Sequence, residues 1–201
     1  MRALPLALAG SVLLSLPAFA CLNGMKENAA PEMELMARSA ARKLLSSDFS
    51  GAAADASTVL QNEGSEPGAR RQARRTLGIA KLRLGEFLVA RDTLQQSLKD
   101  SKDEPTLLAR LGEAEVGLGQ FKQAKARLEG LKTRDLLPDA DAHLALAKAY
   151  LALGDAANGK AELDAALKQQ PDHAGALALK SALEKPAAPA EPAKKPSPNR
   201  S

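Results

Sequence analysis

Large aromatic side chains are almost absent from this sequence. It has no tryptophan, one tyrosine and four phenylalanines among its 201 residues. Any hydrophobic core must therefore be built from leucine and alanine. These residues favour helices packed at close range over a sheet rich in β-branched and aromatic side chains. The composition predicts an all-α protein.

Cysteine is equally scarce, because Cys21 is the single one in the chain. An intramolecular disulfide is therefore excluded. The two histidines, His143 and His173, lack the partners that a metal site or a Cys–His nucleophile requires, so we expect them to be structural or solvated. Phosphate-binding loops, Gly-x-Ser-x-Gly and zinc-helix motifs are missing as well. We expect no enzymatic activity, no cofactor and no resident metal ion.

The first twenty residues differ from the rest of the chain. Arg2 precedes the apolar run LPLALAGSVLLSL, and Ala-Phe-Ala follows directly before Cys21. This order is typical of a signal peptide with a small-x-small cleavage site. The run is too short to cross the roughly 30 Å hydrocarbon core of a bilayer as a helix. We therefore expect residues 1–20 to be an export signal and the mature protein to be periplasmic.

Cys21 would be the first residue after cleavage, which leaves two outcomes open. Ordinary cleavage fits the Ala-Phe-Ala pattern. The run also resembles a bacterial lipoprotein signal in placing alanine before cysteine, although such signals usually carry leucine where this chain has Ala18. Lipidation would account for an unpaired thiol in an oxidising compartment. A membrane contact is expected only if Cys21 is lipidated, which would make the protein an outer-membrane lipoprotein.

The formal net charge of +4 does not indicate nucleic-acid binding. The excess of positive charge lies in Arg2 and in the tail that starts at Lys185, whereas residues 21–184 carry equal numbers of basic and acidic side chains. A neutral body lacks the electrostatic footprint of a polyanion-binding protein. The last residues, 186–201, are rich in proline and alanine and are expected to form a disordered tail.

Glycine-containing turns divide the middle of the chain at a nearly constant period. Gly85, Gly119 and Gly154 each follow a leucine and stand about 34 residues apart. Each frame contains two helical periodicities, and the glycine between them can adopt a left-handed turn. The frames predict a linker at 21–32, a divergent unit at 33–66, clear units at 71–104, 105–138 and 140–173, and a capping helix at 174–185.

This pattern resembles the tetratricopeptide repeat, most closely in residues 140–173. The matching residues there are Leu146, Ala147 and Tyr150 in the first helix, Gly154 in the turn, and Gly159, Ala166, Leu167 and Pro171 in the second helix and at its end. The resemblance implies a right-handed α-solenoid of about four helical hairpins with a C-terminal capping helix. Such hairpins must stack, because one hairpin cannot bury its apolar face alone.

Small residues recur where the two helices of a unit should meet. The predicted pairs are Gly78 with Ala90, Gly112 with Ala124, and Ala147 with Gly159. Leucines one turn away would fill the space between the helices. Between units, Lys81 and Glu115 could form an ion pair, and independent solvation of the two side chains is the alternative.

The resemblance also implies a concave groove, lined by the first helices, that holds a peptide or partner segment. The corresponding positions are Arg75, Ile79, Leu82 and Arg83, then Glu113 and Val116, then Leu144, Lys148 and Leu151. Residues 67–85 contain six basic residues and no acid. We therefore expect a partner segment with apolar anchors and an acidic flank toward the N-terminal half, a solvated basic helix being the alternative.

Two functions follow as hypotheses. The first is a non-catalytic scaffold or adaptor of the cell envelope that binds a protein segment in its groove. The second is an outer-membrane lipoprotein, anchored through Cys21, that acts as a structural component of an envelope assembly or secretion machine.

Overall fold

The structure is a computed structural model that describes the backbone of residues 18–185 and the side chains of residues 30–185. The tail 186–201, most of the predicted export signal 1–20 and the side chain of Cys21 lie outside this part. The helices are α1 (Ala18–Leu45), α2 (Phe49–Gln61), α3 (Pro67–Arg83), α4 (Phe87–Asp100), α5 (Pro105–Gly117), α6 (Phe121–Lys132), α7 (Ala140–Ala152), α8 (Ala156–Gln169) and α9 (Ala174–Glu184). The described part contains no strand, which confirms the all-α prediction.

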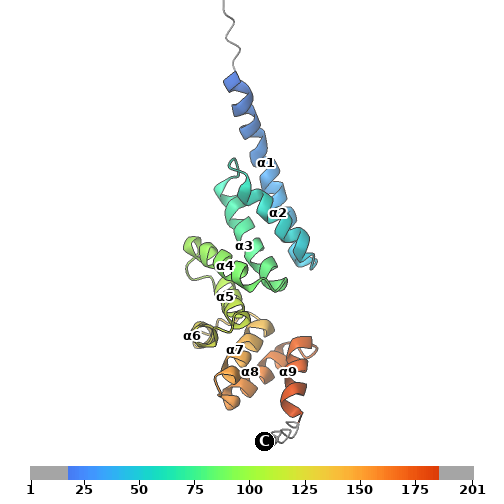
Figure 1. The fold of residues 1–201 in the computed structure, drawn as a ribbon, viewed down its shortest axis with the longest axis vertical. Helices are drawn as coiled ribbons and strands as arrows, with labels where there is room; N and C mark the ends of the chain where they lie inside the picture. Colours follow the sequence, from blue (N-terminus) through green and yellow to red (C-terminus); the bar gives the residue numbers. More distant parts are fainter. Residues whose placement is uncertain (1–17, 186–201) are drawn as a thin grey trace, which may run out of the picture.

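The helices form four antiparallel hairpins that follow one another along the long axis of the molecule, from α1 to α9 (Figure 1). Helix α1 begins well before the first repeat and includes the stretch 21–32 that we expected to be a linker. Helix α3 begins at Pro67, before the expected unit boundary at 71. Proline suits the first helical position because its fixed φ is helical and it needs no hydrogen-bond donor there.

Left-handed residues make the turns inside the hairpins. Gly85, Gly119 and Gly154 have φ values of 77°, 72° and 84°, as the repeat pattern predicted. In the divergent first hairpin the same place, two residues before the phenylalanine, is taken by Ser47 with φ 63°. A residue with a side chain pays roughly 1 to 2 kcal/mol to adopt the left-handed conformation, so the first turn is more strained than the three turns made by glycine.

Glycines let the two helices of the second, third and fourth hairpins approach closely, but the side chains nearest to Gly78 and Gly112 are leucines and not the predicted Ala90 and Ala124. A methyl group added to Gly78 would lie 2.9 Å from the Leu94 side chain, and one added to Gly112 would lie 2.8 Å from the Leu128 side chain. A methyl group on Gly159 would lie 3.3 Å from the Ala147 carbonyl oxygen. The two helices of these hairpins can therefore come this close because glycine has no side chain at the point of contact.

The hairpins stack through alanine and leucine. One buried cluster, between the second and third hairpins, contains Leu94, Leu107 and Leu111. Another, between the third and fourth, includes Leu128 and Leu146. The low aromatic content thus corresponds to a core of aliphatic clusters at successive interfaces.

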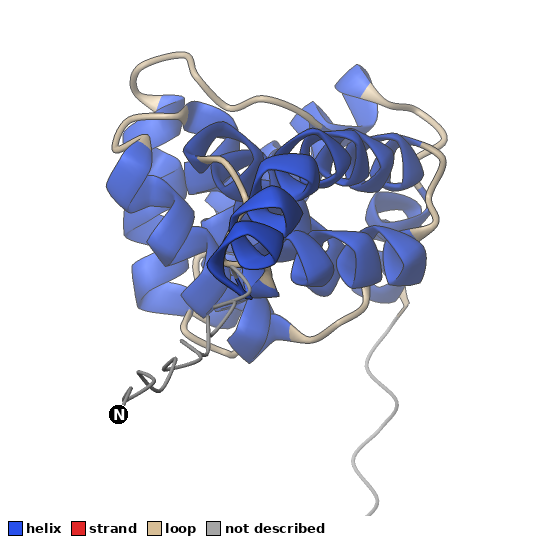
Figure 2. Ribbon diagram, turned by 90° about the horizontal axis from the view of Figure 1, so that it is seen from above, coloured by secondary structure: helices blue, strands red, loops and turns tan. Residues whose placement is uncertain are grey.

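Successive first helices contact one another directly: α1 with α3, α3 with α5, and α5 with α7. Contacts of similar extent between successive second helices are absent from the described part. The first helices therefore form the inner side of the array, and the second helices spread on the outer side. Seen from above, along the long axis, most of the connecting loops lie at the edge of the ribbon (Figure 2). Between residues 18 and 185, none of the helices is long and apolar enough to span a bilayer.

Candidate functional site

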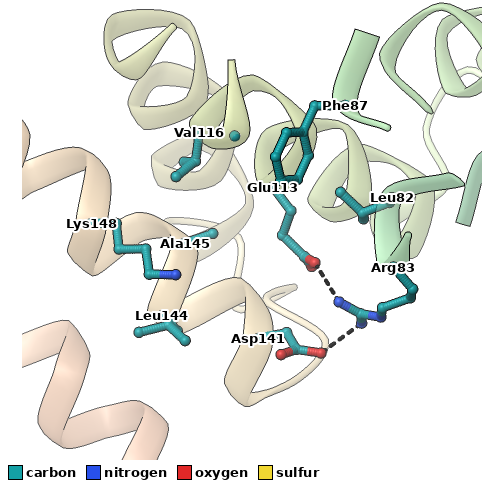
Figure 3. A pocket seen from close by; sticks show the side chains of 10 residues that line it. Leu82, Arg83, Phe87, Glu113, Val116, Asp141, Leu144, Ala145 and Lys148 are labelled. Carbon is teal, nitrogen blue, oxygen red and sulfur yellow. Dashed lines mark hydrogen bonds and ion pairs between the residues drawn. The ribbon is translucent and has the colours of Figure 1, made fainter. Parts of the chain in front are cut away.

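A pocket of about 180 Å³ lies where three successive first helices meet (Figure 3). Its lining residues are Leu82 and Arg83 from α3, Phe87 from α4, Glu113, Val116 and Gly117 from α5, and Asp141, Leu144, Ala145 and Lys148 from α7. Six of the nine groove residues expected from the sequence are thus brought together. They come from three repeat units, so a ligand in the pocket would contact all three.

The other three expected residues lie elsewhere. Arg75 borders a separate hollow between α3 and the start of α5, where it forms an ion pair with Glu104. Ile79 packs on the buried Leu94 cluster between the second and third hairpins. Leu151 packs on α8, where a methyl group added to Gly159 would lie 2.6 Å from it. These side chains hold helices together instead of lining the pocket.

Phe87 and Gly117 line the pocket although the groove positions did not include them. A methyl group on Gly117 would lie 2.4 Å from the nearest carbon of the Phe87 ring, so the ring rests directly on the backbone of α5. Only the third unit places a glycine two residues before the turn glycine, as Gly-Leu-Gly. This additional glycine is the feature of the sequence that could have predicted the contact with Phe87.

A network of ion pairs crosses one side of the pocket. Arg83 donates hydrogen bonds to Glu113 at 3.0 Å and to Asp141 at 2.6 Å. The buried Arg110 donates to the other oxygen of Glu113 and to Asp139. The network therefore joins the end of α3, the last turns of α5 and the first turn of α7. Because both arginines bind two carboxylates, the cluster holds the three helices in a fixed relative position.

His173 extends the network to the capping helix. Its Nδ1 accepts a hydrogen bond from the backbone N–H of Ala176 at 3.2 Å and so caps α9. With Nδ1 acting as acceptor, the proton lies on Nε2, which donates to Asp141 at 2.9 Å. Burial would raise the pKa of Asp141, but Arg83, His173 and Arg110 outweigh burial and hold this pKa below its ordinary value.

The second histidine has a similar structural role. His143 Nδ1 lies 2.8 Å from a carboxylate oxygen of Glu162, which is almost fully buried and also binds Lys132. This cluster ties α7 to α6 and α8. In the part of the chain whose side chains are described, no group of three or more histidine, cysteine, aspartate or glutamate residues is placed to hold a metal ion.

Most of the basic residues in 67–85, from which we expected an acidic flank on the partner, are paired with acids of this chain. Arg74 pairs with Asp100 at 2.7 Å, and Lys81 pairs with Glu86 at 2.8 Å. Arg75 and Arg83 are also paired with acids, as described above. These acids lie outside residues 67–85, so carboxylates offset four of the six positive charges of the acid-free stretch, while Arg70 donates to the carbonyl oxygen of Asn62.

The expected ion pair between Lys81 and Glu115 is absent as well. Lys81 binds Glu86 in its own hairpin, and Arg127 binds both carboxylate oxygens of the buried Glu115 at 3.0 and 2.7 Å. Arg127 lies on α6, the helix that packs against α5 in the same hairpin. The nearer partner within the hairpin therefore replaces the partner that we expected from the neighbouring unit.

Lys148 differs from the other charged residues of the pocket. Its side chain is exposed, and its ammonium group extends toward the pocket in Figure 3 with no ion pair to another described residue. The pocket therefore has paired charges on one side and a solvated cation on the other.

Comparison with known proteins finds a similar fold, but no matching family model and no matching curated protein. The structure is similar to the crystal structure of YrrB, which is described as a TPR protein with an unusual peptide-binding site. The TM-score is 0.53 at 19% sequence identity, and the match covers 71% of each chain. The fold is thus that of a tetratricopeptide repeat array, as the period and the turn glycines predicted.

Proposed function

We propose that this protein is a non-catalytic scaffold that binds a segment of a partner protein in the groove formed by α3, α5 and α7. The pocket between these three helices is the observation that carries the proposal. It lies on the inner side of the array. YrrB, which shares the fold, is described as having a peptide-binding site, and this supports the same class of ligand here.

The size of the pocket favours a single anchoring side chain. An engineered cavity of about 150 Å³ binds benzene, so a pocket of about 180 Å³ can take one aromatic ring or one large aliphatic side chain. Leu82, Phe87, Val116 and Leu144 provide apolar walls for it. The pocket is partly open to solvent, so a side chain of a partner segment can enter it from outside.

One anchor is not enough for a stable complex. Full burial of a leucine or phenylalanine side chain contributes about 1.5 to 3 kcal/mol, whereas a Kd of 1 μM requires about 8 kcal/mol. The remainder must come from contacts along the neighbouring first helices. This comparison favours an extended polypeptide segment over a small molecule.

The cellular location proposed here is the envelope, on the strength of the sequence of residues 1–20. Cleavage after Ala20 would release a soluble periplasmic scaffold. Lipidation of Cys21 would instead give an outer-membrane lipoprotein serving as a structural component of an assembly or secretion machine. Mass spectrometry of the mature N-terminus distinguishes these outcomes, because a diacylglyceryl group adds a defined mass to the peptide that begins at Cys21.

The groove is tested by capturing partners with the full chain and two matched variants. Val116→Arg places a long charged side chain in the pocket, whereas Val89→Arg makes the same change at an exposed position on α4. We expect Val116→Arg to lose the partners that the wild type and Val89→Arg retain. Circular dichroism shows whether both variants remain folded. Equal retention of partners by the two folded variants would contradict binding in the groove.

A further inference from the structure

The charges around the pocket are unevenly distributed. On one side Glu113, Asp139 and Asp141 contribute three carboxylates, while Arg83 and Arg110 contribute two guanidinium groups. This side therefore has one carboxyl group more than it has guanidinium groups, although burial raises the pKa of Glu113 against the opposing effect of Arg110 and Arg83.

The opposite side carries a positive charge. Lys148 lies one turn after Leu144 on the inner face of α7, and its side chain is exposed. Figure 3 shows its ammonium group directed toward the pocket, across from the carboxylates of Glu113 and Asp141. A charged ligand group would therefore be attracted to one side of the pocket and repelled from the other.

Between the two sides the pocket is apolar. In Figure 3 Phe87 lies between Val116 and Leu82, and its ring rests against the bare backbone of Gly117. A ring inserted here can meet Phe87 edge to face or in an offset stack, which aromatic pairs prefer. The position of Phe87 thus favours an aromatic anchor over an aliphatic one.

From this arrangement we infer that the partner segment carries an aromatic side chain for the pocket and an adjacent carboxylate for Lys148. The inference rests on the proposed function and specifies its ligand. The acidic residue of the segment lies on the Lys148 side of its aromatic residue and away from Asp139. The acidic residue of the segment therefore lies near the C-terminal end of α7, where Lys148 stands, and not near the first turn of that helix, where Asp141 stands.

The probe is a library of short random peptides displayed on phage and selected on the full chain. We expect the wild type to enrich peptides with an aromatic residue next to an acidic one. Lys148→Glu should change the preferred neighbour from acidic to basic. Lys122→Glu, the same change at an exposed lysine on α6 outside the pocket, should leave the wild-type preference unaltered.

Fluorescence anisotropy of the best wild-type peptide then gives the size of each effect. We expect Lys148→Glu to weaken binding about threefold to tenfold at low salt, with the difference shrinking as salt is added. Replacing the aromatic residue of the peptide by alanine should weaken binding about tenfold or more, as removal of a central anchor usually does.

The possible failures are distinguishable. If Val116→Arg abolishes peptide binding but the selected peptides show no acidic preference, or Lys148→Glu leaves the preference unchanged, the inference is overturned and the groove remains the binding site. If the selected peptides are acidic but have no aromatic residue, the assignment of the anchor is overturned. If the wild type selects no peptide, or if Val116→Arg binds as well as the wild type, both the inference and the proposed function fail.

Discussion

Replacing Gly112 by alanine tests the close packing that the repeat alignment predicted. The new methyl group would lie 2.8 to 3.2 Å from three carbons of Leu128, whose side chain is fully buried and cannot turn outward. Overpacking of this kind costs about 1 to 3 kcal/mol, while alanine in place of glycine stabilises a helix by roughly 0.5 to 1 kcal/mol. The net expectation is a loss of about 1 kcal/mol in the free energy of unfolding.

Gly130 provides the matched control. It lies inside α6, and a methyl group added there would have no neighbouring atom within 4 Å. Gly130→Ala should therefore stabilise the protein by roughly 0.5 to 1 kcal/mol through helix propensity alone. Urea unfolding monitored by circular dichroism compares the two variants with the wild type. If Gly112→Ala is as stable as Gly130→Ala, the helices of the third hairpin do not pack as closely as the structure indicates.

Three other substitutions test separate features of the array. Ala124→Leu should lower the free energy of unfolding by about 1 to 3 kcal/mol because this alanine is fully buried. Lys122→Leu, two residues away and exposed, should change it by no more than about 0.5 kcal/mol, and equal urea midpoints would argue against the alignment. Ser47→Gly should stabilise the protein by about 0.5 kcal/mol, because glycine adopts a positive φ without strain, and this gain exceeds the extra backbone entropy that glycine loses on folding. A drop in melting temperature would show that the turn is not strained. The pKa of Asp141 is lowered in the folded protein, so its ionised form stabilises the fold fully above the ordinary pKa of 3.8, and this stabilisation is lost as the pH falls through the folded-state pKa. Asp141→Asn should remove this part of the loss of stability in urea unfolding between pH 6 and pH 3. Identical pH profiles for the variant and the wild type would contradict the ion-pair network.

The hairpin architecture could be predicted from the sequence because it depends on local and periodic signals. Gly85, Gly119 and Gly154 fixed the turns, since glycine adopts positive φ without the steric penalty of a side chain. Gly78 and Gly112 located the close contacts between helices. A period of about 34 residues then placed the units in register.

The electrostatics could not be predicted in the same way. Arg83 stands in a stretch without acids, yet it binds Asp141, which is 58 residues further along the chain and two hairpins away. Arg75 occupies an expected groove position but is held at the neighbouring hollow by Glu104. Such pairings depend on how successive hairpins rotate relative to one another, and residue spacing within one unit does not specify that rotation.

The pocket itself was predicted in part. Its walls from α5 and α7 follow from the repeat positions, because equivalent residues of successive first helices lie on the same face. Phe87 is not among the groove positions that the resemblance implied. Its place beside the pocket depends on the missing side chain of Gly117, which is particular to the third unit.

Site-specific photo-crosslinking tests the central claim most directly. A photoreactive amino acid is placed at Val116 in the pocket or at Val89 on α4, and the full chain is illuminated in cells that express it. We expect a discrete crosslinked partner from position 116 and none from position 89, and a weaker crosslink from position 116 when Lys148→Glu is added. A crosslink to the same partner from position 89 alone would contradict the claim that the groove between α3, α5 and α7 is the binding site.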